Sequence, residues 1–158
     1  MISVVKRNGV VEPLNLDKLH RMVEFACDGL AGVSESAIEM NSNLQFYENI
    51  MTSDIQEILI RSANDLISLE QPNYQYVAAR LLLFSYRKSV YKGHPDNPPP
   101  LIEHIKECIA KGVYDPDLIK QYSEEEWSEL HDFIDWDRDY LFTYAGLRQV
   151  VDKYLVQD

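Results

Sequence analysis

Residues 5–19 read VKRNGVVEPLNLDKL, and this stretch decides the fold of the first half of the chain. Two short β-branched runs flank Asn8-Gly9, the dipeptide most typical of a two-residue hairpin turn because both positions tolerate positive φ. Asn15 then suits the N-cap of a helix. Since a lone hairpin is not stable in water, we expect it to pack on the helices that follow.

Two helices are predicted directly after the hairpin. The first begins at the Asn15 cap, carries apolar residues at helical spacing and ends near Gly29. The second begins at Ser34, carries Leu44 on its apolar face and ends near Tyr47.

Two more helices complete the first half. Ser53 and Gln56 match a capping box that would open the third helix, and Pro72 suits the first turn of the fourth. The fourth helix is apolar nearly all round, which indicates burial by its neighbours. The predicted fold class is therefore mainly α, with a small N-terminal β-hairpin capping a four-helix cone over residues 1–92 and a short-helix segment after it.

The helical pattern stops at residues 93–100, GHPDNPPP, which predict a stiff proline-rich connector. Residues 101–158 resume with short helical segments and are expected to form a helical appendage that lies on something larger. These segments are 101–111 before Gly112, one opened by Asp115-Pro116, one capped by Ser123 with Glu126, and one from about Tyr144 to Tyr154.

Charge is distributed unevenly. The formal net charge is −11. Residues 1–92 hold nine Lys and Arg against eleven Asp and Glu, whereas residues 93–158 hold six against fifteen. The near-neutral first half can still gather its cations at one site. The chain lacks the basic face that nucleic-acid binding requires, so we expect no nucleic-acid partner.

Cysteine and hydropathy point to a cytoplasmic protein. Cys27 and Cys108 stand in unrelated contexts and form no disulfide or metal-binding pattern, so free thiols in a reducing compartment are expected. No apolar run approaches the ~18 residues of a membrane span, and we expect no membrane partner.

Motifs of catalysis are missing from the sequence. It contains no phosphate-binding P-loop, no GxGxxG, no HExxH and no GxSxG, so we place no catalytic residue here. His104 and Cys108 stand one helical turn apart, but two ligands without a third favour an ordinary helix face over a metal site. The acidic residues of 132–139 favour a solvated turn over a carboxylate metal site. We therefore expect no metal bound by the protein.

The motifs of the first half resemble the ATP-cone family. The family pattern is a strand ending in Lys-Arg-(Asp/Asn)-Gly, a second strand, and Asn-x-x-Lys at the start of a helix, as in residues 5–19. Further matches are Thr52-Ser53-Asp54-Ile55, Tyr74-x-Tyr76-x-Ala78-Ala79-Arg80-Leu81, and the closing Arg87-Lys88. Residues 114–157 resemble the stretch before the catalytic barrel in large subunits of class I ribonucleotide reductases. The barrel itself, with its redox cysteines, is not part of this sequence.

The resemblance implies a set of nucleotide-binding residues. Cations hold the phosphates, polar residues read adenine, and apolar residues line the base, whereas Gln56 stands where relatives often have histidine. The phosphate residues are Lys6, Arg7 and Lys88; the adenine residues are Glu12, Asn15 and Lys18; the lining residues are Leu14, Leu19 and Phe46; Thr52 caps or contacts the ligand. Without the resemblance, the cations would simply be solvated, Asn15 would be only an N-cap, and the apolar residues would be core.

The same resemblance implies an allosteric function. ATP or dATP, with Mg²⁺, would act as the effector that sets the overall activity of a ribonucleoside-diphosphate reductase. The expected partners are the small, radical-bearing β subunit and other large subunits. Two alternatives are an ATP-cone transcriptional regulator, which would need a zinc ribbon before the cone, and an interaction module whose cone has lost its ligand.

Overall fold

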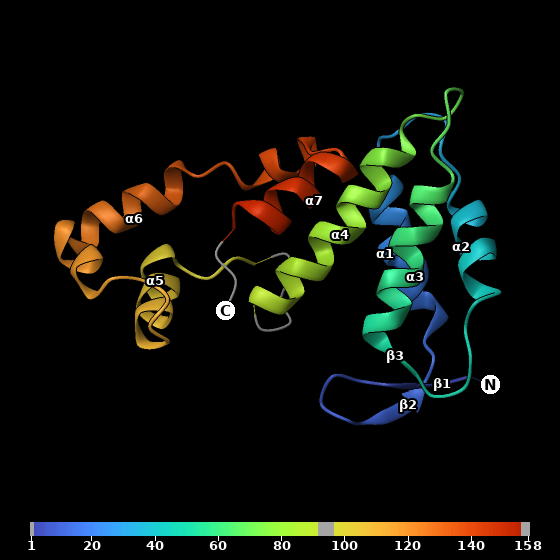
Figure 1. The fold of residues 1–158 in the computed structure, drawn as a ribbon, viewed down its shortest axis with the longest axis horizontal. Helices are drawn as coiled ribbons and strands as arrows, with labels where there is room; N and C mark the ends of the chain where they lie inside the picture. Colours follow the sequence, from blue (N-terminus) through green and yellow to red (C-terminus); the bar gives the residue numbers. More distant parts are fainter. Residues whose placement is uncertain (1, 92–96, 156–158) are drawn as a thin grey trace.

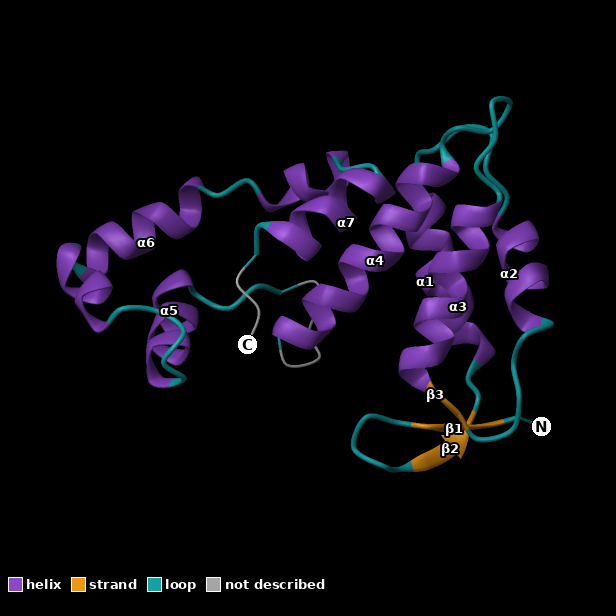
Figure 2. Cartoon of the chain, viewed as in Figure 1, coloured by secondary structure: helices purple, strands orange, loops and turns teal. Residues whose placement is uncertain are grey.

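A computed structural model describes residues 2–91 and 97–155 and shows a mainly helical chain with a small sheet at one end (Figures 1 and 2). The fold class is as expected. Strands β1 (Ser3–Val5) and β2 (Val11–Pro13) pair antiparallel, with Val5 opposite Val11. A third strand, β3 (Ile50–Met51), pairs parallel with the free side of β1 and was not expected, because two residues leave no pattern in the sequence.

The hairpin turn is longer than predicted. The Lys6 amide donates to the Val10 carbonyl at 2.9 Å, and the Gly9 amide donates to the Lys6 carbonyl at 2.8 Å, which leaves three residues in the loop instead of two. Gly9 has φ of 80°, whereas Asn8 does not have positive φ. A three-residue loop of this kind places its glycine in the left-handed region after a type I turn. Asn8 instead accepts a hydrogen bond from the Val10 amide through its side chain.

Four helices form the cone, and α3 and α4 pack along each other at its centre. They are α1 (Leu16–Cys27), α2 (Glu35–Asn43), α3 (Thr52–Asp65) and α4 (Tyr74–Val90). Asn15 and Ser34 cap α1 and α2 as predicted. Pro72 lies just before α4 instead of in its first turn.

The end of α2 was predicted too late. The helix stops at Asn43, and Leu44 is 84% exposed instead of belonging to the core. Ser42 donates its hydroxyl to the Glu39 carbonyl, and tight turn bonds follow, including one from the Gln45 amide to the Ser42 carbonyl. Short polar side chains that bond the backbone in this way compete with helix continuation.

The predicted capping box of α3 is also wrong. The helix begins at Thr52 directly after β3, and its N-cap residue, Met51, makes no side-chain capping bond. Pairing with β1 fixes how the chain enters the helix, so Ser53 falls inside the first turn. Gln56 is thereby free to turn inward, where it is buried.

The core of the cone is apolar and continuous. It contains Val23, Leu59, Val77 and Leu81, each at most 1% exposed. Tyr74 is equally buried, and its hydroxyl accepts a hydrogen bond from the Ser34 amide at 2.9 Å. This bond ties the start of α4 to the start of α2, at the end of the cone away from the sheet (Figure 1).

The second half divides between two places (Figure 1). Segments α5 (Leu101–Ala110), η1 (Pro116–Gln121) and α6 (Glu124–Phe133) pack together away from the cone. Segments η2 (Trp136–Leu141) and α7 (Tyr144–Lys153) return to pack on α4. The Ser123–Glu126 capping box is confirmed.

Side chains of α7 extend the core of the cone. Leu147 and Val151 join the same buried cluster as the helices of the first half. Residues 93–96 of the predicted connector lie outside the described residues, so the division into residues 1–92, 93–100 and 101–158 stays a prediction. Within the part of the chain that the structure describes, no helix is long and apolar enough to cross a membrane.

Candidate functional site

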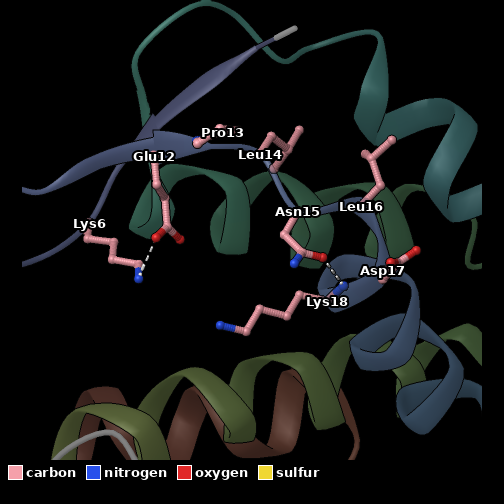
Figure 3. Close-up of a pocket in the computed structure, with 8 residues that line it drawn as sticks. All are labelled: Lys6, Glu12, Pro13, Leu14, Asn15, Leu16, Asp17 and Lys18. Carbon is pink, nitrogen blue, oxygen red and sulfur yellow. Dashed lines mark hydrogen bonds and ion pairs between the residues drawn. The ribbon is translucent and has the colours of Figure 1, made fainter.

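A cavity lies where the sheet, α1, α3 and α4 meet. Its inner part has a volume of about 200 Å³ and is lined by Val4, Glu12, Leu14, Asn15, Lys18, Leu19, Met22, Thr52, Ile55, Gln56, Phe84 and Lys88. An outer hollow of about 570 Å³ runs along β2 and the first turn of α1, from Lys6 to Lys18 (Figure 3). The two share Glu12, Leu14, Asn15 and Lys18, so they form one continuous depression.

The inner cavity has an apolar side and a polar side. Leu19, Met22, Ile55 and Phe84 supply hydrocarbon, sulfur and an aromatic ring from three helices. Apolar walls with a few placed polar groups are typical of small-molecule sites. The arrangement suits a flat heterocycle on the apolar side and a charged group on the polar side.

Asn15 has a structural function and remains available to a ligand. Its Oδ1 accepts the Lys18 amide at 2.9 Å, which caps α1. The same bond holds the side chain at the mouth of the cavity (Figure 3). Because capping uses only the oxygen, the Nδ2 group keeps two donors for a ligand.

Lys6 and Glu12 face each other across the hairpin. Their Nζ and Oε2 atoms are 2.7 Å apart, and the side chains are 40% and 36% exposed (Figure 3). A pair this exposed adds little to folding stability. It does place a carboxylate and an ammonium group side by side at the edge of the cavity.

Lys88 lies close to three other positively charged side chains. Burial lowers the pKa of Lys88, and the positive charges of Arg7, Lys18 and Lys6 lower it further. These four cations come from the strand end, the hairpin loop, the start of α1 and the last turn of α4. Among the described residues, no ion pair joins Arg7, Lys18 or Lys88 to a carboxylate, so an anion would relieve their repulsion.

Gln56 forms part of the cavity wall and is held from behind. Its Nε2 group donates to the Leu81 carbonyl and lies at the same 3.3 Å distance from Met22 Sδ. The buried amide is therefore fixed in orientation by α1 and α4. Its oxygen remains the atom with which it can accept a hydrogen bond from a ligand.

The structure brings most of the sequence-predicted residues together. Of the eleven, nine line the two parts of the cavity. Arg7 lines neither part but lies close enough for its charge to act on Lys88. Phe46 lies in the turn after α2 and packs against the core, outside the lining.

Four residues that line the inner cavity were missed: Val4, Met22, Ile55 and Phe84. Helical spacing could have found the three that lie on helices. Met22 follows Lys18 by four residues, Phe84 precedes Lys88 by four, and Ile55 follows Thr52 by three. Residues three or four apart share a helix face. The apolar wall could therefore have been predicted by taking, on each helix, the apolar residue one turn away from the predicted polar residue.

Other candidate groups remain isolated. His104 Nε2 lies 3.6 Å from Cys108 Sγ on α5. Cys27 and Cys108 are free, and burial raises the pKa of Cys27 to about 11. No group of three or more His, Cys, Asp or Glu side chains within residues 2–91 and 97–155 is placed to hold a metal ion.

Comparison with known proteins gives consistent matches. The ATP cone domain family matches residues 2–89. The chain is 48% identical over 157 residues to ribonucleoside-diphosphate reductase subunit alpha of Haemophilus influenzae and 47% identical to ribonucleoside-diphosphate reductase 1 subunit alpha of Escherichia coli. Both alignments cover 99% of this chain and 20% of the relative. The corresponding subunit of phage T4 is 40% identical over 160 residues, with 100% of this chain and 21% of the relative covered.

The chain therefore spans about a fifth of the length of the curated relatives it matches. The family match covers the sheet and all four helices of the cone. The alignments with the reductase subunits extend beyond the cone and include α5, α6 and α7.

Proposed function

The chain belongs to the ATP-cone family, and on this premise we propose that its cavity binds ATP or dATP as an allosteric effector. One observation carries the proposal: Lys6, Arg7 and Lys18 converge on Lys88, beside an apolar cavity whose other edge holds Glu12 and Asn15. A triphosphate supplies the missing negative charge, and a purine ring fits the apolar side.

The phosphates lie against the cations in this proposal. Lys6 and Arg7 approach from the hairpin, and Lys88 approaches from the end of α4. Arginine offers a planar fork to phosphate oxygens, whereas lysine acts as a point charge. Lys18 carries a fourth positive charge close to the same place, so that the cluster matches a ligand with several negative charges.

The base is recognised at the entry to α1. The Glu12 carboxylate accepts from the exocyclic amine of adenine, and Asn15 Nδ2 donates to a ring nitrogen. Leu14 and Leu19 cover the ring, with Phe84 on the same apolar wall. Thr52 and Gln56, which also line the inner cavity, reach the sugar or the phosphates in this proposal.

Mg²⁺ accompanies the triphosphate. Magnesium prefers oxygen ligands and is commonly held by phosphate oxygens and water with few protein ligands. In our proposal the ion enters with the nucleotide and neutralises part of its charge. The effector is therefore the nucleotide, with the metal as its counterion.

The role of the site in a larger protein follows from the named relatives, which are alpha subunits of ribonucleoside-diphosphate reductases. We propose that this chain is the corresponding regulatory region and itself contributes no catalytic residue. ATP favours the active reductase and dATP favours an inhibited assembly, through contacts with the β subunit or other large subunits. Linkage requires each nucleotide to prefer a different assembly.

Calorimetric titration of two variants tests the assignment. Arg7→Ala should lose roughly 1.5–3 kcal/mol of ATP binding, the range for hydrogen bonds to charged groups. Glu12→Ala should instead reduce the preference for ATP over GTP and leave the dependence on phosphate number intact. If neither ATP nor dATP binds the folded wild-type chain at millimolar concentration, an interaction module without a ligand becomes the better account.

A further inference from the structure

Arg87, the residue before Lys88, is buried in a cluster contributed by η2. Its Nη2 group donates to the Trp136 carbonyl and to Asp139 Oδ2, both at 2.8 Å. Its Nη1 group donates to the Tyr140 hydroxyl at 3.1 Å, and the guanidinium carbon lies 5.2 Å from the centre of the Tyr140 ring. The side chain is only 10% exposed, so the last turn of α4 is tied to the second half of the chain.

Tyr140 connects this cluster with the rest of the cone. Its ring packs edge-on against Phe25 of α1, with centres 5.8 Å apart. Arg80, two turns before Arg87 on α4, also approaches the ring, at 6.0 Å from its centre. The contact between η2 and the cone therefore spans both α1 and α4, which are two of the helices that line the cavity.

The last turn of a helix is its weakest part, because its carbonyl groups lack partners within the helix and its ends fray. Lys88 lies in this turn and is repelled by Arg7, Lys18 and Lys6. An untied end would let Lys88 move away from the other cations. The bonds of Arg87 oppose that movement, since the two residues share one backbone turn.

We propose that Arg87, Asp139 and Tyr140 position Lys88 in the cavity, so that nucleotide binding and the docking of η2 and α7 on α4 strengthen each other. This inference rests on the proposed function. A triphosphate holds Lys88 in place, which stabilises the last turn of α4 and with it the surface on which η2 sits. Docking of η2 in turn keeps Lys88 where the phosphates need it. Coupling of this kind is reciprocal by linkage.

The test compares Asp139→Asn with a matched control, Asp152→Asn. Asp152 pairs with Arg148 on the exposed surface of α7, 3.5 Å away, and takes no part in the cluster. Asp139→Asn should weaken ATP binding about fivefold, at the low end of allosteric coupling, and change AMP binding less than about twofold. Asp152→Asn should change neither. Tyr140→Phe, which keeps the ring and removes one bond, should give a smaller loss in the same direction.

Amide hydrogen exchange supplies the reciprocal readout. Saturating ATP should slow exchange in residues 136–153 of the wild-type chain, and this slowing should diminish in Asp139→Asn. Equal loss of ATP and AMP affinity, or unchanged ATP affinity in both cluster variants, would overturn the proposal. The proposal would also be overturned if ATP did not change the rate of amide exchange in residues 136–153 of the wild-type chain. Failure of the wild-type chain to bind ATP at all would instead reject the proposed function.

Discussion

Arg87 and Lys88 are consecutive residues of one helix, yet their surroundings differ: Arg87 is surrounded by acceptors within the fold, whereas Lys88 lies among other positive charges. Arg87 donates to three oxygen acceptors, all in η2: the Trp136 carbonyl, Asp139 Oδ2 and the Tyr140 hydroxyl. Burial, the largest single influence, would lower the pKa of Arg87, but the hydrogen bond to Asp139 and the charge interactions with Tyr140, Asp139 and Tyr91 together hold the pKa above the ordinary value. For Lys88, burial and three neighbouring cations all act to lower the pKa.

The contrast separates a structural charge from a binding charge. A buried ion is tolerated when its partners lie within the fold, as for Arg87. A cation that is held among like charges, as Lys88 is, destabilises the fold. An anionic ligand that neutralises these charges would explain why the four cations lie together. The two residues therefore distinguish the part of α4 that holds the chain together from the part that, in our proposal, binds the nucleotide.

The largest effect is expected for Arg87→Met. It leaves Asp139 and the Trp136 carbonyl without their donor and should lower the free energy of unfolding by about 2–3 kcal/mol. This is below the usual cost of breaking a buried pair, because the Asp139 side chain is 41% exposed to water. Urea denaturation measures the loss.

Arg61→Met provides the matched control for that measurement. Arg61 pairs with Glu57 one turn away on α3, and both side chains are more than half exposed. Its removal should cost less than about 0.5 kcal/mol. If both arginine variants lost the same free energy of unfolding, the contacts of Arg87 would stabilise the fold no more than an exposed surface ion pair does.

Gln56→His should tighten dATP binding by on the order of 1 kcal/mol at pH 6, because a protonated imidazole on the cavity wall adds a charge-assisted bond. The gain should fade by pH 8, when the ring is mostly neutral. Titration calorimetry at the two pH values checks this. Equal dATP affinity for variant and wild type at both would place residue 56 out of reach of the ligand.

Lys88→Met should have the smallest effect on folding and the opposite sign to Arg87→Met. Removing a repelled cation should raise the free energy of unfolding by a few tenths of a kcal/mol at pH 7, since the group is partly solvated. Because the pKa of Lys88 is lowered in the folded wild type, its amine binds a proton more readily in the unfolded chain. The contribution of Lys88 to the free energy of unfolding therefore rises with pH between the lowered pKa and the ordinary value of 10.5.

Urea titrations of both proteins across that pH range check the trend. The difference between Lys88→Met and wild type should shrink as the pH rises, because the wild-type ammonium loses its charge. The account would be contradicted if this difference grew with pH, or if the variant were less stable than the wild type at pH 7. Either result would mean that Lys88 is stabilised by a partner within the protein.

Much of the cone was predictable because its signals are local. Asn15 and Ser34 cap their helices through neighbouring amides, and Ser123 does so in the second half. The cation cluster was placed through the family resemblance, since its members are up to 82 positions apart, from Lys6 to Lys88. Spacing alone would not have joined them.

The features that were missed depend on contacts between distant segments. β3 exists because β1 offers it an edge, and this pairing turned Gln56 from a capping residue into a cavity wall. The η2 cluster likewise needs Arg87 and Asp139, 52 positions apart, to meet. Such contacts leave no periodic trace, and the acidic turn around Asp139 therefore looked merely solvated.

The most direct test of the cation cluster is calorimetric titration of the wild-type chain with ATP, ADP and AMP at low and high salt. If Lys6, Arg7, Lys18 and Lys88 hold the phosphates, affinity should fall at each loss of a phosphate. ATP should also lose more affinity with salt than AMP, because exposed charge interactions are screened. Equal affinities for ATP and AMP, unchanged by salt, would contradict the account and leave the repulsion around Lys88 without a function.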